Sequence, residues 1–533
     1  MIIRLPDIAC VYGEDNSVLF SSAENIENDN VVFSARIEND MLIPSVTSNE
    51  IPLCYIVLKW LFKNEEKRSE PVKILSDHWE RGYGDLAWQG VSHTRHMPWY
   101  FLVSNGSDSN TNYSGRHTEG FGVKVRPSSF CCWQYDTGGV TLHIDIRCGC
   151  KGVILNGRTL DACEVIFTDY YNISAFESGQ QFCRSMCTDP VFPKEPVYGF
   201  NNWYYAYGVS SEEEIIRDTD YLAHCTQGLS SPFMVIDDCW QPNRCDGPWH
   251  CGNDKFPDMK QLANEIKIRG VRPGVWLRPL RQKNPFDEIP ENWRLPRDIT
   301  CLDPSNDEVL DYIENTFSRI VDWGYELIKF DFITYDIFGR WGKDSPDFMS
   351  VGSWTFKNRN KTSAEIIIDL YRRIRKGSKG AILIGCNAIG HLCAGIVEIN
   401  RTGDDTSGLD WQRTRVMGVN TLAFRALHNQ AFYMSDADCA AITSNVKWSL
   451  NAKWLKILSA SGSPLFISWD IKVNSPEIIE AVKNALSRNS VQRDVLIPLD
   501  WMENTCPERW QLNGEEIYID WFEDLTDNII KPL

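Results

Sequence analysis

The sequence predicts a multidomain α/β and β protein. We expect an N-terminal β-sandwich over residues 1–195, a central (β/α)8 TIM barrel over residues 196–475, and a short C-terminal β region over residues 476–533. The first part alternates short β-rich runs with Asn, Asp, Gly and Ser clusters, as β-sandwiches do. The second part alternates strand and helix patterns, which is typical of a parallel sheet covered by helices. A proline-rich stretch around Pro193 marks the linker between them.

Within the N-terminal part, the β-rich runs are short and no strong helix is predicted. Its loops are rich in turn-forming residues, which end strands rather than helices. The runs that predict strands are 31–37, 55–61, 121–125, 140–146 and 164–168.

The central part contains eight strand patterns with helices between most of them. Eight such units match a closed barrel better than an open sheet. The absence of a Gly-rich phosphate loop after the first strand counts against a dinucleotide-binding fold. The predicted strands are 197–203, 233–237, 271–277, 325–333, 381–386, 396–400, 431–435 and 464–469. The predicted helices are 211–225, 259–269, 308–323, 364–375, 411–427 and 448–460, and after Pro476 a helix over 478–488 precedes three short strands.

Composition excludes several classes of partner. The formal net charge is -18 and no clustered basic face is visible, which argues against nucleic acid and against an anionic membrane. No segment has the length of a signal peptide core or a membrane span, so the expected location is cytoplasmic. In a reducing cytoplasm the 18 cysteines stay thiols. We expect no metal and no cofactor, because no histidine or cysteine pairs stand at metal spacing.

The most informative stretch is the strand 325–333. It is apolar apart from two charges near its end, Lys329 and Asp331, which point the same way because they are two residues apart. Such charges cost desolvation energy unless they face a polar pocket or each other, so the pair indicates either a structural ion pair or a catalytic site. A second acidic stretch, Asp404 and Asp405, follows the strand 396–400. Two strand-end carboxylates in one barrel favour sugar hydrolysis.

The two carboxyl groups suit different roles. A neighbouring cation favours an ionised carboxylate, so Lys329 suits Asp331 to the role of nucleophile. The second group must donate a proton to the leaving group. Asp404 and Asp405 compete for that role, because adjacent residues point in different directions.

The other strand ends carry polar and aromatic residues that suit a neutral polyol. A divalent ion held by Asp237, Asp238 and Asp331 is the alternative, to which we give less weight because a metal site would favour histidines or a tighter acidic cluster. The strand-end residues are Trp203, Asp237, Asp238, Trp276, Arg278, Lys329, Asp331, Cys386, Asn387, Arg401, Asp404, Asp405, Asp436 and Asp438.

Together these motifs resemble the melibiase-type α-galactosidases, glycoside hydrolase families 27 and 36. The motifs are Asn202–Trp203, Val235–Trp240, Gly274–Trp276, Lys329–Asp331, Cys386–Asn387 and Arg401–Asp405. The β domain before the barrel is similar to family 36. The resemblance implies a retaining, exo-acting α-galactosidase that hydrolyses terminal α-linked galactose by double displacement, with a small carbohydrate as its partner. Family 36 members often form dimers or tetramers, so a homo-oligomer is compatible with it.

The resemblance also implies roles for single residues. Asp331 corresponds to the nucleophile and Asp405 to the acid/base. The remaining positions correspond to the sugar subsite: Asp237 and Asp238 for the 4- and 6-hydroxyls, Lys329 for O3 or O4, Arg401 for Asp405 and the 2-hydroxyl, Trp203 and Trp276 for the wall, and Cys386 and Asn387 for the 2-substituent.

Other activities of the same clan stay open. They are an α-N-acetylgalactosaminidase, a β-L-arabinopyranosidase and a transglycosylase such as a raffinose or stachyose synthase. The room beside Cys386 and Asn387 separates the first from a galactosidase, and the room beside Asp238 separates the second. The alternative that is not an enzyme is a galactose-binding protein without catalytic activity.

Overall fold

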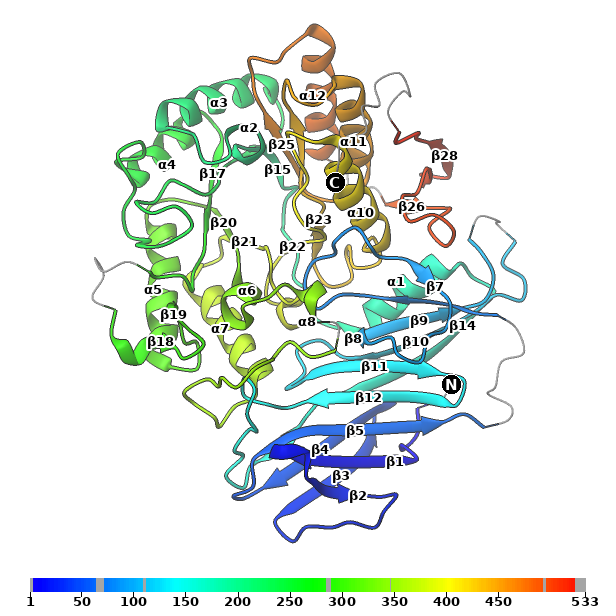
Figure 1. Cartoon of the computed structure of the whole chain (residues 1–533). Helices are drawn as coiled ribbons and strands as arrows, with labels where there is room; N and C mark the ends of the chain where they lie inside the picture. The colour runs from blue at the N-terminus through cyan, green and yellow to red at the C-terminus, as the bar shows by residue number, and fades with distance from the viewer. Residues whose placement is uncertain are drawn as a thin grey trace.

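The computed structural model describes residues 3–63, 71–108, 112–283, 289–345, 347–491 and 495–522. Figure 1 shows antiparallel sheets from the N-terminal third below a barrel of parallel strands and helices, with a small C-terminal sheet beside the barrel. This arrangement confirms the predicted fold class. The boundaries after residues 195 and 475 stay a prediction of where the domains divide.

Two antiparallel sheets make up the N-terminal part. Their order is β2-β1-β5-β12-β11-β8 in one, and β13-β4-β14-β10-β9-β6-β7 with β3 paired to β4 in the other. Large buried aromatics such as Trp60, Trp133 and Phe167 pack between the strands, with the Trp60 and Phe167 rings 5.2 Å apart. The strands are β1 (Ile8–Gly13), β2 (Val18–Ser21), β3 (Val31–Glu38), β4 (Met41–Ser48), β5 (Leu53–Leu61), β6 (Lys73–Ser76), β7 (Trp88–Gln89), β8 (Met97–Pro98), β9 (Tyr100–Ser104), β10 (His117–Val123), β11 (Phe130–Asp136), β12 (Gly139–Asp145), β13 (Thr159–Asp161) and β14 (Val165–Tyr171).

The N-terminal part also contains a helix that the sequence analysis did not predict, α1 (Ala175–Met186). Ser174 caps it by accepting a hydrogen bond from the backbone of Glu177, and its buried residues recur at helical spacing. Gly179 weakens the sequence signal, yet a Cβ there would lie 2.8 Å from side-chain atoms of Leu102 and Leu427. The helix therefore packs closely between the β sheets and the barrel.

Eight strand positions of one parallel sheet close the barrel. The sheet order is β23-β22-β21-β20-β17-β16-β15-β25-β24, and β23 and β24 are two pieces of one continuous segment. The first piece pairs with β22 and the second with β25, so this segment joins the two edges of the sheet. The strands are β15 (Tyr198–Asn201), β16 (Phe233–Ile236), β17 (Arg272–Leu277), β20 (Leu327–Phe330), β21 (Ile382–Gly385), β22 (Ile399–Arg401), β23 (Met434–Asp436), β24 (Cys439–Ile442) and β25 (Leu465–Trp469).

Helices cover the outside of the barrel, and polar caps begin most of the long ones. Thr362, for example, forms a capping box with Glu365 at the start of α7. The helices are α2 (Trp203–Ala206), α3 (Glu212–Cys225), α4 (Met259–Ile268), α5 (Asp307–Asp322), α6 (Ile333–Phe338), α7 (Ser363–Gly377), α8 (Gly390–Cys393), α9 (Trp411–Arg413), α10 (Asn420–Phe424), α11 (Trp448–Ala460) and α12 (Pro476–Asn489). Three short 3-10 turns, η1 (Glu14–Asn16), η2 (Glu291–Trp293) and η3 (Gly342–Asp344), and the hairpin of β18 (Arg294–Leu295) and β19 (Asp298–Leu302) complete these two parts.

Two elements differ from the sequence prediction. The helix expected over 411–427 is broken into α9, a π-helical turn η4 (Thr414–Val419) and α10. Near this break, the Thr414 hydroxyl accepts from the backbone of Ser407 and donates back to its carbonyl. The helix predicted over 478–488 is α12, which begins two residues earlier, at Pro476, and packs against α11 and α3.

The C-terminal sheet is small and is attached to both other parts. It contains β26 (Leu496–Pro498), β27 (Arg509–Leu512) and β28 (Glu515–Tyr518). Trp411 donates a hydrogen bond to the carbonyl of Trp521 over 3.0 Å, and Lys73 donates one to the carbonyl of Met502 over 2.7 Å. These contacts fix the sheet beside the barrel.

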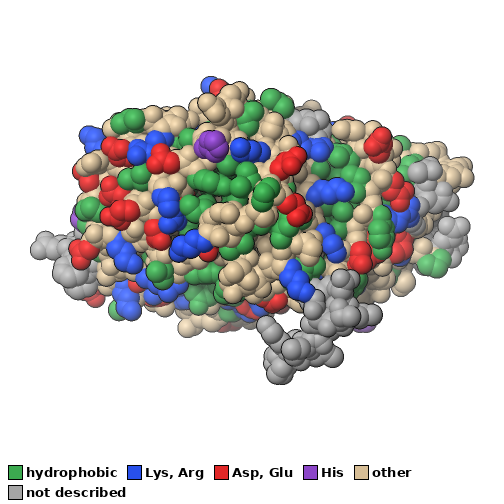
Figure 2. Space-filling model, turned by 90° about the horizontal axis from the view of Figure 1, so that it is seen from above, with side chains coloured by type: hydrophobic (Ala, Val, Ile, Leu, Met, Phe, Trp, Pro, Cys, Tyr) green, Lys and Arg blue, Asp and Glu red, His purple; other side chains and the backbone are tan. Residues whose placement is uncertain are grey.

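All 18 cysteines are free thiols. None of the helices in the described ranges is long and apolar enough to cross a bilayer. The face in Figure 2 mixes acidic, basic and apolar side chains rather than gathering one sign of charge.

Candidate active site

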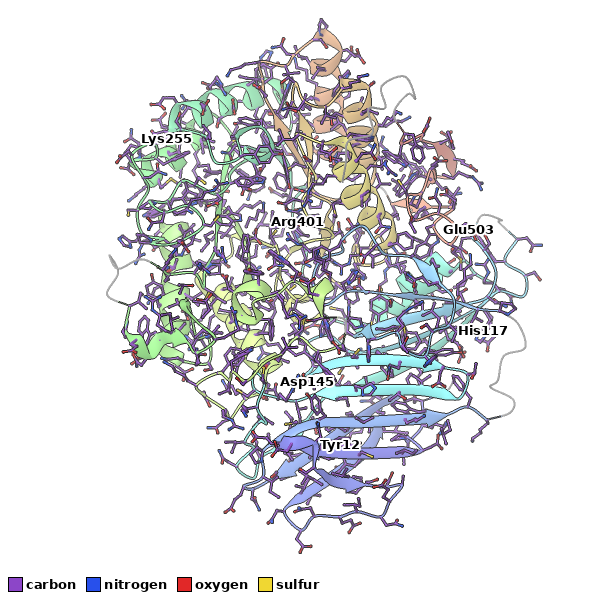
Figure 3. All side chains as sticks on the ribbon, in the orientation of Figure 1. Tyr12, His117, Asp145, Lys255, Arg401 and Glu503 are labelled. Carbon is purple, nitrogen blue, oxygen red and sulfur yellow. The ribbon has the colours of Figure 1, made fainter. Side chains whose placement is uncertain are left out.

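The predicted site residues lie at the carboxyl ends of the barrel strands, where sites of this fold are found. Lys329 is in β20 and Arg401 ends β22, while Asp237, Asp331 and Cys386 directly follow β16, β20 and β21. Figure 3 shows Arg401 near the centre of the molecule, in the barrel. The barrel therefore gathers these groups at one end.

A buried ion pair at this end joins β20 to the residue after β16, across the intervening strand β17. The Lys329 ammonium lies 2.8 Å from Oδ2 of Asp237, and the Asn201 side chain donates to the same oxygen over 2.8 Å. Burial alone would lower the pKa of Lys329, but the charge of Asp237 raises it well above the ordinary value. Lys329 thus carries a positive charge at neutral pH, and its direct partner is Asp237 rather than Asp331.

The Asp331 carboxylate is fixed at both oxygens. Oδ2 accepts a hydrogen bond from the indole of Trp276 over 3.1 Å, and Oδ1 accepts one from the backbone of Phe332 over 2.7 Å. Phe332 has a φ of 63°, an unusual value for a bulky residue, at the turn from β20 into α6. Strained residues of this kind cluster at functional sites. Trp276 is buried and supports Asp331 from behind.

Asp404 and Asp405 differ in their surroundings. Asp404 forms ion pairs with Arg81 and Arg413, each over 2.9 Å. The side chain of Asp405 is 39% exposed, and its nearest cation is Arg401 over 3.3 Å. Asp404 is therefore held between two arginines, whereas Asp405 is more open to a ligand.

The charge around Asp405 is strongly positive. Burial alone would raise the pKa of this carboxyl, but Arg401, Arg81 and Lys329 outweigh burial and lower its pKa below the ordinary value. From the sequence, a raised pKa was expected for the general acid. Because the pKa of Asp405 is lowered instead, the unliganded protein holds this carboxyl in its ionised, basic form. Proton donation by this group would therefore be favoured at acidic pH.

Cys386 follows β21, the strand between β20 and β22 in the barrel sheet. Burial raises the pKa of its thiol well above the ordinary value and Asp331 raises it further, while Arg401, Lys329 and Arg81 oppose this. Arg401 donates a hydrogen bond to the sulfur over 3.7 Å. The charged residues that act on the Cys386 thiol come from β20, from β22 and from the N-terminal part. These three parts of the chain therefore meet near Cys386.

The side chain of Asn387 is fully engaged by the protein. Its amide donates to Glu80, and its side-chain oxygen accepts from the backbone of Tyr335 over 3.2 Å. Asn387 is buried, as is Cys386. Both side chains are therefore shielded from solvent.

The segment after Asp238 folds back onto its carboxylate. Oδ1 accepts hydrogen bonds from the backbone of Cys239 and from Gln241, each over 2.7 Å, and Oδ2 accepts one from the Cys245 thiol over 2.7 Å. Both oxygens of Asp238 are therefore held by hydrogen bonds from this segment. The half-buried Trp203 begins α2 after β15, the strand beside β16, and its ring lies 5.8 Å from that of Tyr207.

Two acidic residues at the seventh strand join the site. Asp438 pairs with Arg401 over 2.9 Å and accepts a hydrogen bond from the Tyr204 hydroxyl. Burial raises the pKa of Asp436 to about 6, with Arg401 opposing. The sequence placed both residues at a strand end, but it gave no signal for their partners.

A loop of the N-terminal part completes the site, and the sequence analysis missed it. We call residues 77–87, between β6 and β7, the crossing loop. It carries Glu80, which binds Asn387, and Arg81, which binds Asp404. Its charged residues resemble those of any solvated loop in the sequence, so no local signal identifies them.

Arg278, at the end of β17, does not face the carboxylates of the site. It pairs with Asp336 of α6 over 2.5 Å, and its guanidinium lies 4.1 Å from the centre of the Phe332 ring. Arg278 therefore supports the turn that follows Asp331.

The described residues contain one group suited to a metal ion by its donor atoms, and it lies away from the barrel. His117, Glu119 and Asp169, on β10 and β14, bring three potential ligand atoms within 4.8 Å of one another. Figure 3 places His117 among the β sheets, apart from Arg401. Asp237, Asp238 and Asp331 form no such group in the described ranges. The divalent-ion interpretation of these three carboxylates therefore has no geometric support.

No family model matches the sequence. Several solved structures share its fold. An α-galactosidase from Thermus thermophilus, in complex with p-nitrophenyl α-D-galactopyranoside, is 16% identical with a TM-score of 0.59, and the match covers 91% of this chain and 99% of that one. An α-galactosidase from Lactobacillus brevis is 13% identical with a TM-score of 0.59, and the match covers 94% of this chain and 74% of that one.

A third structure is a variant of a GH36 α-galactosidase from Geobacillus stearothermophilus, in complex with raffinose. It is 13% identical with a TM-score of 0.60, and the match covers 96% of this chain and 79% of that one. These likenesses confirm the fold that the motifs implied, including the β domain before the barrel.

Proposed function

We propose that this protein is a retaining, exo-acting α-galactosidase of the family 36 type. The observation that carries the proposal is that Asp331 follows β20 and Asp405 follows β22, the two strands that flank β21 and the Cys386 at its end. A carboxylate on each side of one sugar ring is what double displacement requires. Structures of the same fold that contain galactosides support a carbohydrate as the substrate.

In the proposed reaction Asp331 attacks the anomeric carbon of galactose while Asp405 protonates the glycosidic oxygen. The bond to the leaving group breaks and a covalent galactosyl ester forms on Asp331. Asp405, now ionised, then removes a proton from water, which attacks the same carbon and releases α-galactose. The arginines around Asp405 favour its basic form, and this suits the second step.

The remaining residues would bind the sugar. Asp237, Lys329 and Asp238 offer charged groups to the ring hydroxyls, and Trp203 offers an apolar surface. Asn387 is buried with Cys386 and its amide is hydrogen-bonded to Glu80, which favours a 2-hydroxyl over a bulky 2-acetamido group. Whether a C6 hydroxymethyl arm fits beside Asp238, whose Oδ2 accepts from Cys245, separates galactose from arabinopyranose, and turnover of the two nitrophenyl glycosides measures it.

Azide rescue tests the two catalytic roles separately. In Asp331→Gly, azide replaces the nucleophile and should give β-galactosyl azide from an activated α-galactoside. In Asp405→Ala, azide attacks the galactosyl enzyme and should give α-galactosyl azide. NMR of the products separates these outcomes, and Asp404→Ala decides between the two adjacent acids.

The expected result is α-azide from the Asp405 variant and none from the Asp404 variant. The opposite pattern would transfer the acid/base role to Asp404. Undiminished turnover of p-nitrophenyl α-galactoside by Asp331→Gly would remove the proposal, and galactose binding without turnover by the wild type would identify a binding protein. Transfer of galactose to a second sugar instead of water would identify a transglycosylase.

A further inference from the structure

The crossing loop forms backbone hydrogen bonds with the segment that carries Asp404 and Asp405. The N–H of Gly82 donates to the carbonyl of Thr402 over 2.8 Å, and the N–H of Asp404 donates to the carbonyl of Gly82 over 2.9 Å. Gly82 and Gly403 thereby form an isolated parallel bridge. A Cβ at Gly82 would lie 3.0 Å from the Thr421 side chain, so the close approach favours glycine there.

Glu80 holds the loop to two further barrel segments. Its carboxylate is buried, and it accepts hydrogen bonds from the side chain of Asn387 and from the backbone of Gly342, the latter over 2.8 Å. It also accepts one from the Tyr83 hydroxyl within the loop. A buried carboxylate with several donors is fixed in place, because each lost donor would leave a costly unpaired group. The loop is therefore anchored after β20, after β21 and after β22.

Between these anchors, Arg81 reaches the acidic pair. Its guanidinium lies 2.9 Å from Asp404 and 3.8 Å from Asp405. It also lies 5.0 Å from the centre of the Trp341 ring, over its face. Arg81 is 7% exposed, and its Nε has no hydrogen-bond partner in the described part of the chain. A buried guanidinium is thus held between Asp404 and the Trp341 ring, beside the more exposed carboxylate of Asp405.

We propose that Arg81 is a positioning residue for the acid/base Asp405, supplied to the barrel site by the N-terminal β domain of the same chain. This inference rests on the function proposed above. Arg81 binds Asp404 directly, which keeps that carboxylate away from the substrate, and it acts on Asp405 across 3.8 Å. Its charge favours the ionised Asp405 that exists after the proton has moved to the leaving group.

The other groups around Asp405 come from every neighbouring element. Arg401, which ends β22, is the nearest cation, and Arg401 is shared with Asp438. The groups whose charges act on Asp405 or on its direct partners are Tyr204 of α2, Lys329 of β20, Arg401 of β22, Arg413 of α9, Asp404 beside it and Asp438 between β23 and β24. Because Arg401 is divided between two carboxylates, the additional charge of Arg81 has a distinct effect.

The test compares Arg81→Met and Arg81→Lys with wild type in the full chain. The alkaline limb of kcat/KM against pH reports the general acid of the free enzyme. Loss of the Arg81 charge should raise the pKa of Asp405, so this limb should move to higher pH by about one unit. That size follows from Coulomb's law for two charges at this separation with the screening of bulk water, the weakest case. Arg81→Lys keeps the charge and should restore most of the wild-type limb.

Leaving-group dependence supplies the second measurement. The dinitrophenolate of a dinitrophenyl galactoside leaves without protonation. The alcohol leaving group of an alkyl galactoside or of raffinose needs a proton from the general acid. If Arg81 positions the acid, Arg81→Met should lose at least tenfold more kcat/KM on raffinose than on the dinitrophenyl substrate.

Arg158→Met is the matched control. Arg158 also joins the β domain to the barrel, through an ion pair with Glu365 over 2.7 Å, but neither residue is part of the site. It should leave both the limb and the leaving-group dependence unchanged. An equal loss on both substrates with an unmoved limb would overturn the role of Arg81 while leaving the α-galactosidase intact. An inactive wild type would overturn both proposals.

Discussion

The buried ion pair at the base of the crossing loop should be essential for stability. Asp77 and Arg425 are 3% and 2% exposed, and their side chains are 2.8 Å apart. Asp77 also accepts a hydrogen bond from the indole of Trp99 over 3.1 Å. Asp77→Ala would leave the Arg425 charge without a carboxylate in a place that water does not reach. Removing one partner of a buried pair costs about 3–5 kcal/mol, and we expect that loss here.

Asp189→Ala is the matched comparison. Arg126 and Asp189 also form a pair, over 2.6 Å, but Asp189 is 63% exposed, so its removal should cost less than about 1 kcal/mol. Urea denaturation followed by tryptophan fluorescence measures both variants. The double variant Asp77→Ala/Arg425→Met should recover most of the loss, because it leaves no unpaired charge.

The pH dependence of this loss provides a further check. Burial alone would raise the pKa of Asp77, but Arg425 outweighs it and the folded-state pKa is lowered. The stabilisation is therefore present above pH about 4 and disappears as the pH falls through the folded-state value. An Asp77→Ala penalty no larger than that of Asp189→Ala at pH 7 would refute the reasoning.

Two further predictions concern the buried rings of His391 and Trp276. Burial lowers the pKa of His391 to about 3, so the folded protein keeps it neutral while the unfolded chain takes up a proton below pH about 6.5. Stability should fall as the pH drops from 6.5, and His391→Phe should flatten that slope in denaturation curves between pH 4 and 7; an unchanged slope would contradict this. Trp276→Phe removes a donor from Asp331 and should lower kcat/KM about tenfold or more, since a hydrogen bond to a charged group contributes about 1.5–3 kcal/mol. Trp249→Phe, whose ring lies 6.0 Å from that of Trp276, should change it less than threefold; equal losses would assign the effect to packing.

The barrel and its strand-end residues could be predicted because both depend on local patterns. A strand buried in a parallel sheet is almost entirely apolar, so the charges of Lys329 and Asp331 stand out in the sequence. The carboxyl ends of all the strands lie at one end of the barrel, so residues far apart in the chain could be assigned to one site. The bounds of β20, Leu327–Phe330, are shorter than the apolar run that predicted it, because the chain turns at Phe332.

The contribution of the N-terminal part could not be predicted, because it depends on how two domains pack. Arg81 and Glu80 carry no periodic signal, and their partners lie far along the chain. The helix α1 was missed for a related reason: the space between Leu102 and Leu427 requires Gly179, which lowers helix propensity in the sequence. The ion-pair partner of Lys329 could not be predicted either, because it depends on how the barrel strands are arranged. The Lys329 ammonium binds Asp237 rather than Asp331, which is only two residues away in the sequence.

The seventh strand of the barrel is interrupted between β23 and β24, and this interruption should affect local hydrogen exchange. Between β23 and β24 the residue Asp438 has a φ of 73°, and its N–H donates to the side chain of Asp436 instead of to a neighbouring strand. β23 and β24 keep their backbone pairing with β22 and β25, but the ladder is interrupted between them at Asp438. Amide hydrogens here should exchange with solvent sooner than those of β20, and a galactoside bound as proposed should slow them.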